Sequence, residues 1–460
     1  MNKKALTGIL TLIMVITCSF TGFFIGKTFS GLESHGRYDV LDELSEVLNQ
    51  YHYSDVDEND LLMGAANGMV SSLNDPYTFL FEYSANQSIG EEYIGIGISF
   101  SLIDGEFVVK DVIEDSPADL SGVRINDVLI KIGDTLLENK SFTDLGLLIK
   151  VNLGEENTLT FLRGSREYSV TLVSSVINAP SIKYRNIDGI GYIKIVEFSE
   201  KTANLFNQAL KALENENITG LIIDVRDNPG GYLGSVVNIL TNFMTGNSPY
   251  LRIENVKESD QELKNTYYYP LRDTVKKSYD IKVLINENSA SAAEVFAVAM
   301  HYNGGYDLIG KTTYGKSVYQ VDYEMQTLKN YYLHITLGNW YGPDNYSVKD
   351  QGIAPTKVVS ENSYMNLAQV ILTDEKYELD VVSDDVKQIQ LMLKCLGYDV
   401  RTDGYFDEGT LLVLNNNFSK AYIDAALADE IYDLYKVEVK KDIHDALLQE
   451  ALLELKWELM

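Results

Sequence analysis

Apolar residues recur at two different spacings along the chain, and the changes of spacing divide it into regions. Between Asp39 and Leu73 they fall three and four residues apart, which predicts two amphipathic helices. From about Glu91 to Val176, short strand-like runs separated by turn signals, the first from Ile94 to Phe100, predict a small β-rich module. From about Ala179 to Val359, strands alternate with helical runs, which is typical of an α/β layer fold. Beyond Asn362 the helical spacing returns.

This pattern predicts a multidomain α/β protein. A length of 460 residues requires more than one core, since single cores stop growing near roughly 250 to 300 residues. We divide the chain into an anchor, a helical N-terminal region, the β-rich module, the α/β core, a small all-α domain and a helical tail, at 1–26, 27–90, 91–176, 177–372, 373–420 and 421–460.

The N-terminus has the composition of a secretory signal or membrane anchor. Two lysines precede an uncharged run from Ala5 to Gly26, and about 20 apolar residues are enough to cross a bilayer. The run ends without a small-residue cleavage site, so we expect an uncleaved transmembrane helix with the remainder outside the membrane. The residues before Cys18 resemble a lipoprotein cleavage box only weakly, because Thr17 stands where a smaller residue is preferred.

Composition excludes several classes of function. The 67 acidic residues outnumber the 38 Lys and Arg, and the net charge of −29 repels nucleic acid, so we expect no nucleic-acid partner. The two cysteines, Cys18 and Cys395, lie in segments of different character, which argues against a disulfide framework. The chain contains neither HExxH nor CxxC, so we expect no metal, and no other cofactor is implied.

The first candidate for chemistry is Ser291, which follows an apolar strand and stands where an apolar helix begins. A serine at this position ordinarily caps the helix through a backbone N–H. Alternatively, the turn presents the hydroxyl as a nucleophile, and free N–H groups at the helix start, beginning with Ala292, stabilise an oxyanion. The pattern alone leaves both interpretations open.

A nucleophilic serine needs a base, and none of the five histidines has an obvious Ser-His-Asp setting. Lys316 follows a glycine and opens a segment with strand character, in which Lys316, Val318 and Gln320 would point to one face. Gln320 would then orient the amine. Lysine becomes a base near neutrality only if burial lowers its pKa, and a Gly-Lys pair by itself is more typical of a surface lysine.

A third segment begins as a buried strand at Leu221 and ends in the sharp turn Asn228-Pro-Gly-Gly231. This is either an ordinary strand-to-loop turn or the source of a second oxyanion donor, the backbone N–H of Gly230 or Gly231.

Taken in order, the three segments resemble the signature blocks of the C-terminal processing peptidases, the tail-specific serine proteases. The resemblance implies that Ser291, rather than Ser289, is the nucleophile, that Lys316 is the base and that Gln320 orients it. It also implies that the α/β core at 177–372 is a Ser/Lys protease that acts through an acyl-enzyme.

The β-rich module resembles the PDZ domain that these proteases carry ahead of their core. The run Tyr93-Ile-Gly-Ile-Gly-Ile98 resembles the carboxylate-binding loop, which implies that a peptide C-terminus binds at Ile94, Gly95, Ile96, Gly97 and Ile98. Ser116, followed by Pro117, is suited to cap a short helix. The stretch from Ser116 to Ile130 matches a further PDZ block, with Asn126 in place of glycine. Asn is compatible with that position because it tolerates left-handed backbone.

Two segments near the C-terminus, Val386 to Asp399 and Thr402 to Thr410, resemble a peptidoglycan-binding helical module. A plain interaction bundle stays the alternative, because a fold alone establishes no ligand. We expect removal of everything after Thr373 to spare catalysis. The tail at 421–460 carries no pattern that assigns it a role.

The resemblance implies a membrane-anchored, extracytoplasmic serine endopeptidase that cleaves the C-terminal tails of proteins. Its expected partners are those tails, peptidoglycan, the membrane and, through the N-terminal helices, a second copy of the chain. One alternative is a catalytically silent PDZ scaffold at the cell wall, against which the intact Ser291, Lys316 and Gln320 argue. Another is a Ser/Lys amidase that acts on wall peptides.

Overall fold

The computed structural model describes residues 38–458 except 83–87, 90–91, 104, 114, 139, 141, 151, 164–165, 179, 255–264, 272–273, 366, 368, 371 and 373–375. It forms two compact units, Met1–Leu80 and Phe81–Met460. The membrane anchor predicted for residues 1–26 lies outside the described residues. Within the part that the structure describes, no helix is long and apolar enough to cross a bilayer.

The first unit contains the two helices that the periodicity predicts, α2 (Asp39–Tyr51) and α3 (Glu58–Ser71). Asp57 caps α3 by accepting hydrogen bonds from two backbone N–H groups of its first turn. Neither helix buries a residue. The apolar face of α2 therefore stays exposed, with Leu41, Leu44 and Leu48 at 37%, 52% and 36% exposure.

The second unit begins with the β-rich module. Its strands are β4 (Ile98–Ile103), β5 (Glu106–Val112), β6 (Val128–Ile132), β7 (Thr135–Leu136), β8 (Glu156–Arg163) and β9 (Arg166–Val173). They form an antiparallel sheet of order β4-β5-β6-β8-β9, in which the short β7 pairs with β6. Helices α4 (Pro117–Leu120) and α5 (Phe142–Leu148) complete it. As predicted, Ser116 caps α4 and Asn126 has a left-handed backbone, with φ 71°.

One predicted strand of this module is interrupted. The sequence pattern runs without a break from Ile94 to Phe100, but β3 (Glu92–Gly95) ends before Ile96, and β4 begins at Ile98. Gly97 turns the chain between them with φ +82°. Strand β3 then pairs with β2 (Ser88–Ile89) and β10 (Ser175–Asn178) in a small separate sheet.

The α/β core is built on a sheet of order β11-β12-β13-β16-β17-β20, in which only the β11–β12 pair is antiparallel. Its strands are β11 (Ile182–Ile187), β12 (Ile190–Ile195), β13 (Gly220–Asp224), β16 (Asp280–Ile285), β17 (Asp307–Gly310) and β20 (Lys357–Val358). Every residue of β13 is buried, which fits a parallel strand that is covered on both faces.

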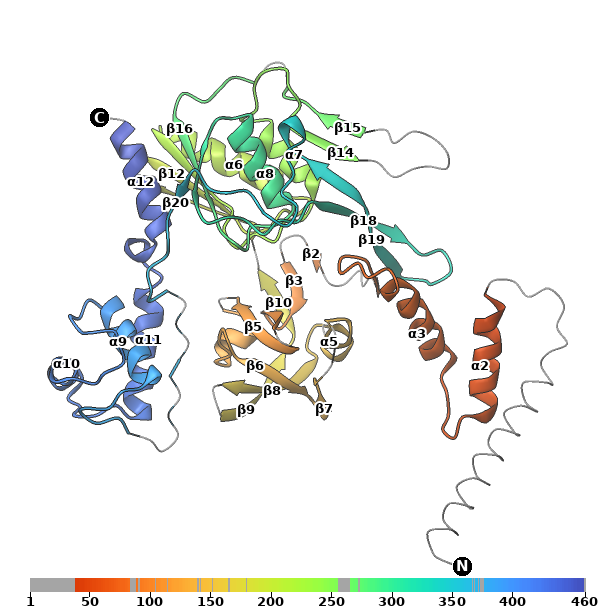
Figure 1. Cartoon of the computed structure of the whole chain (residues 1–460), viewed down its shortest axis with the longest axis horizontal. Helices are drawn as coiled ribbons and strands as arrows, with labels where there is room; N and C mark the ends of the chain where they lie inside the picture. The colour runs from red at the N-terminus through yellow and green to blue at the C-terminus, as the bar shows by residue number, and fades with distance from the viewer. Residues whose placement is uncertain are drawn as a thin grey trace, which may run out of the picture. The chain divides into compact units, whose positions relative to one another are not determined.

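Helices cover the two faces of this sheet (Figure 1). One face packs against α6 (Thr202–Asn215), α7 (Leu233–Leu240) and α8 (Ala292–Tyr302). The other packs against α12 (Ala446–Glu458), the last helix of the chain. The tail at 421–460, to which the sequence pattern assigned no role, therefore supplies a layer of the α/β core, through the buried residues Leu447, Leu448, Ala451, Leu452 and Leu455.

The remaining elements extend the core. A second sheet contains β14 (Leu251–Glu254), β15 (Asn265–Tyr268), β18 (Val318–Glu324) and β19 (Tyr331–Tyr341). Helices α9 (Asp384–Cys395), α10 (Glu408–Phe418) and α11 (Ala425–Glu438) enclose a separate apolar cluster. The short helix η2 (Asp442–His444) then leads from α11 back to α12 and the core sheet.

Candidate active site

Ser291 stands between the end of β16 and the start of α8, in a strained backbone conformation. Its φ of 55° and ψ of −114° are unfavourable for a residue with a side chain, and such strain persists only where the surroundings impose it. Ser289, two residues earlier, is fully buried and donates its hydroxyl to the carbonyl oxygen of Val225 at 2.8 Å. Ser289 therefore fixes the turn, and Ser291 is the serine whose hydroxyl is left for chemistry.

Ser291 occupies the N-cap position of α8, in a capping-box arrangement with Glu294. The carboxylate of Glu294, in the first turn of the helix, accepts a hydrogen bond from the backbone N–H of Ser291 at 2.9 Å. The bond orients the residue through its backbone and does not engage its side chain.

Glu294 also holds the lysine segment. Its Oε2 atom accepts from the backbone N–H of Lys316 at 2.8 Å as well as from Ser291. Its Oε1 atom accepts from the hydroxyl of Thr313 and the N–H of Gly315, both at 2.7 Å. One oxygen atom thus lies within hydrogen-bond reach of the backbones of both predicted catalytic residues, Ser291 and Lys316.

The side chain of Glu294 is fully buried. Burial raises the pKa of this carboxyl above its usual range, and the hydrogen bonds from Thr313, Gly315, Ser291 and Lys316 act in the opposite direction. Sequence reasoning assigned Glu294 no role. A signal was available, because a glutamate three residues after a serine at a helix start has the spacing of a capping box.

The predicted strand geometry around Lys316 is wrong. Strand β18 begins at Val318, so Lys316 lies before the strand and the alternation expected for it does not apply; the register shift with β19 leaves its extra residue, Leu337, in β19. Lys316 is half-buried, and its carbonyl oxygen accepts a hydrogen bond from the indole of Trp340 at 3.0 Å.

Gln320 donates its side-chain amide to the hydroxyl of Thr336, on the neighbouring strand β19, at 3.2 Å. Whether Gln320 orients Lys316 during turnover stays a prediction.

The glycine turn after β13 packs directly against Ser291. A Cβ atom built on Gly230, where φ is +107°, would lie 2.9 Å from the Cβ of Ser291 and 3.0 Å from the backbone nitrogen of Ala292. Any side chain at this position would collide with the turn that carries Ser291. The sequence predicted that the two segments meet, and the structure brings them into contact.

The backbone N–H groups at this contact differ in their hydrogen bonding. Gly230 donates its N–H to the side-chain oxygen of Asn228 at 2.8 Å, so this predicted oxyanion donor is already engaged. Among the described residues, the N–H groups of Gly231 and Ala292 have no hydrogen-bond partner. These two are the donors that remain for a developing oxyanion.

The β-rich module has the features of a peptide-binding groove. Strand β4 is an edge strand of its sheet, so its outer backbone groups can pair with an added strand. The carbonyl oxygens of Ile96 and Gly97 accept hydrogen bonds from Ala118 and Ile113, while within the described residues the N–H groups of Ile96 and Gly97 have no partner. A Cβ on Gly97 would lie 2.1 Å from the Cβ of Ser116.

Three family models match the chain: peptidase family S41 over residues 189–359, the PDZ domain over 95–173, and the activating protease CtpB N-terminal domain over 33–84. The carboxy-terminal processing protease CtpB of Bacillus subtilis (strain 168) is 32% identical over 434 residues, which cover 91% of this chain and 88% of that protein. The carboxy-terminal processing protease CtpA of the same strain is 26% identical over 470 residues, which cover 98% of each.

Among solved structures, the photosystem II D1 C-terminal processing protease superimposes with a TM-score of 0.53. Its identity is 18%, and the match covers 71% of this chain and 94% of that one, so it supports a common fold. The family assignment rests on the 32% identity to the Bacillus subtilis protein CtpB over most of both chains, together with the matched domains. The chain belongs to peptidase family S41 as a relative of the carboxy-terminal processing proteases, and it is a serine-type peptidase that carries a PDZ domain.

Proposed function

We propose that the protein is an extracytoplasmic endopeptidase that cleaves the C-terminal tails of proteins with Ser291 as nucleophile and Lys316 as base. The observation that carries this proposal is the Glu294 carboxylate, whose Oε2 atom accepts from the backbone N–H groups of both residues, at 2.9 and 2.8 Å. A buried acceptor shared by two loops fixes their relative position, which a two-residue catalytic unit requires.

In the proposed reaction, the Ser291 oxygen attacks the carbonyl carbon of the scissile peptide, and its proton passes to the neutral amine of Lys316. The carbonyl oxygen becomes an oxyanion that accepts hydrogen bonds from the N–H groups of Gly231 and Ala292. The protonated Lys316 then returns the proton to the leaving amine, which yields an acyl-enzyme. A water molecule, deprotonated by Lys316, hydrolyses the ester and regenerates Ser291.

The PDZ domain would select the substrate. A chain end that pairs with edge strand β4 places its carboxylate at the free N–H groups of Ile96 and Gly97. Substrates with an accessible, extended C-terminus are thereby favoured over folded ones.

Three further contacts are proposed for the rest of the chain. The apolar run from Ala5 to Gly26 would anchor the protein in the membrane, and the helical module would bind peptidoglycan. The module is rigid enough for recognition, because the buried amide of Gln390 donates to the carbonyl of Tyr405 at 2.8 Å and accepts from the N–H of Gly404 at 2.9 Å. The exposed apolar face of α2 would pair with a second copy of the chain.

Replacing either member of the dyad tests the mechanism. Ser291→Ala, Lys316→Ala and Lys316→Arg should each lower the turnover of an unfolded, dye-labelled protein by about 10³-fold or more, because a guanidinium stays charged and cannot accept the proton. Lys311→Arg is the matched control, because Lys311 forms an exposed ion pair with Glu287. A folded Lys316→Arg protein that keeps a tenth of the wild-type rate would exclude Lys316 as the base.

The Glu294→Gln substitution tests the shared acceptor. An amide replaces one oxygen by an N–H₂ group, which cannot accept from backbone N–H groups. We expect the free energy of unfolding to fall by about 1–3 kcal/mol and kcat to fall more than tenfold. Thermal denaturation and initial rates measure the two effects. Glu287→Gln, whose side chain is 55% exposed, should change neither. Wild-type stability and kcat in Glu294→Gln would contradict the assigned role.

The Gly97→Ala substitution tests tail recognition. The added methyl group collides with Ser116, so the loop cannot keep its shape. We expect Gly97→Ala to cleave a peptide with a free C-terminus and its C-terminally amidated form at equal rates, whereas the wild type prefers the free form. Gly105→Ala is the control, because Gly105 also has a positive φ, +86°, but has no atom within 4 Å of the added methyl. A preserved preference in Gly97→Ala would refute the loop assignment.

Wall binding is tested with the full-length protein in mild detergent. It should sediment with purified peptidoglycan and be released by soluble muropeptides but not by an unrelated polysaccharide. If the protein stays in the supernatant, the helical module is an interaction bundle and not a wall-binding domain.

A further inference from the structure

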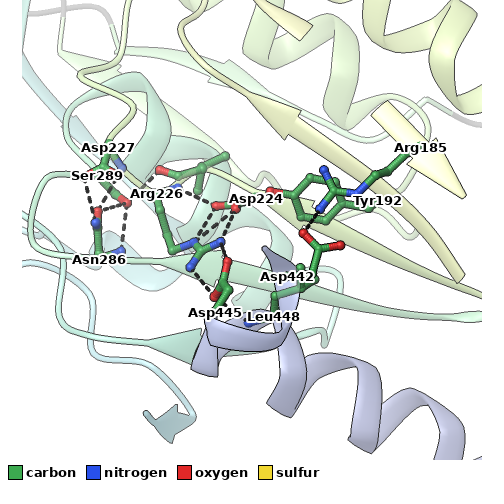
Figure 2. A network of polar contacts seen from close by, with 11 residues as sticks. Arg185, Tyr192, Asp224, Arg226, Asp227, Asn286, Ser289, Asp442, Asp445 and Leu448 are labelled. Carbon is green, nitrogen blue, oxygen red and sulfur yellow. Dashed lines mark hydrogen bonds and ion pairs between the residues drawn. The ribbon is translucent and has the colours of Figure 1, made fainter. Parts of the chain in front are cut away.

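The C-terminal end of the chain contacts the strand that leads to the oxyanion turn. Helix α12 buries Leu448 and Ala451 against the core sheet, in a cluster that includes Ile222 of β13 and Leu284 of β16. Strand β13 ends at Asp224, six residues before Gly230. The start of α12 lies beside this strand end (Figure 2).

A buried ion pair stands at the end of β13. Asp224 is completely buried and accepts a hydrogen bond from Nη2 of Arg226 at 2.6 Å and from the hydroxyl of Tyr192 at 2.7 Å. It also accepts the backbone N–H of Arg226 at 2.9 Å, so it holds both the side chain and the main chain of that residue. Burial opposes the charge of Asp224, but Arg226 prevails and lowers the pKa of this carboxyl.

Asp445, at the start of α12, is a second carboxylate that binds the Arg226 guanidinium (Figure 2). Its two oxygens accept from Nη1 and Nη2 of Arg226 at 2.8 and 2.7 Å, a bidentate geometry that fixes the plane of the guanidinium. The same carboxylate accepts the N–H of Leu448 at 2.9 Å, which caps the helix. The Arg226 side chain is only 9% exposed, and these two carboxylates compensate its buried positive charge.

The residues on either side of Arg226 are tied to the turn that carries Ser291. The carbonyl of Val225 accepts from the hydroxyl of Ser289 at 2.8 Å. The backbone N–H of Asp227 donates to the side-chain oxygen of Asn286, and the Asn286 amide donates to the Asp227 carboxylate, both at 2.9 Å. Further along, the carbonyl of Asn228 accepts from the N–H of Ala290 at 3.0 Å. A shift of Arg226 would therefore move the glycine turn and the nucleophile turn against each other.

We propose that Asp445 is a positioning residue for the oxyanion site, through which the C-terminal helix holds Arg226 and hence the turn that contains Gly230 and Gly231. This inference rests on the proposed function, because it assigns the turn to oxyanion stabilisation. Removing one carboxylate leaves a buried guanidinium with half of its partners, and a buried charge that loses a partner forces rearrangement or hydration around it.

The sequence pattern led us to expect that removal of everything after Thr373 would spare catalysis. The position of α12 argues against this expectation, because the truncation would uncover the apolar residues of the core sheet. It would also leave Arg226 without Asp445.

The test replaces Asp445 by residues that still cap a helix. Asn and Ser both keep the cap but remove the charge, so Asp445→Asn and Asp445→Ser separate the ion pair from the stability of α12. The matched control is Asp442→Asn, three residues earlier, which removes an ion pair between Asp442 and Arg185 that is 42% and 47% exposed. Thermal denaturation of the full-length protein identifies variants that fold.

We expect Asp445→Asn and Asp445→Ser to lower kcat about tenfold with less than a twofold change in KM. Their affinity for a tripeptide boronic acid, whose tetrahedral adduct with Ser291 occupies the oxyanion site, should fall by a similar factor. Asp442→Asn should match the wild type in all three quantities. If both Asp445 variants fold and keep kcat and boronate affinity within twofold, the inference is wrong, although the proposed function stands. If Ser291→Ala retains activity, the proposed function itself fails.

Discussion

The active site depends on one buried carboxylate that joins two loops. Glu294 receives four hydrogen bonds, from Thr313, Gly315, Lys316 and Ser291, and all four partners donate. Hydrogen bonds to a charged group contribute about 1.5–3 kcal/mol each, whereas an unfavourable backbone conformation such as that of Ser291 costs about 1–3 kcal/mol. The strained turn can persist because this acceptor, together with the packing of Gly230 against it, offsets its cost.

A second constraint comes from the core sheet. A mostly parallel sheet must be covered on both faces, and here helices from the middle of the chain cover only one. The other face is covered by α12, which follows the whole helical module in sequence. The catalytic core is therefore complete only when the C-terminus has been added. This explains how Arg226, beside the glycine turn, comes to bind Asp445, which lies more than 200 residues away in the chain.

Local sequence signals predicted most of the elements but not how distant ones meet. Turn residues and alternation placed the strands of the PDZ domain, and the capping role of Ser116 and the left-handed Asn126 were confirmed. Alternation failed at Gly97, where a glycine with a left-handed backbone turns the chain between two strands. The helical spacing of α12 was readable, but its apolar stripe does not say which surface it covers. The roles of Glu294 and Asp445 could not be predicted because each depends on partners brought together by the fold.

The structure separates the chemistry of the site from its supports. The candidate nucleophile and base, Ser291 and Lys316, and the N–H groups of Gly231 and Ala292 come from three turns, and each turn also forms hydrogen bonds with residues outside it. Glu294 holds two of them, and Arg226, between Asp224 and Asp445, stands at the base of the third. Both supports are charged groups in apolar surroundings, where losing a partner costs more than a typical surface interaction contributes. The sensitivity of the site to substitution should therefore be greatest at residues that never touch the substrate.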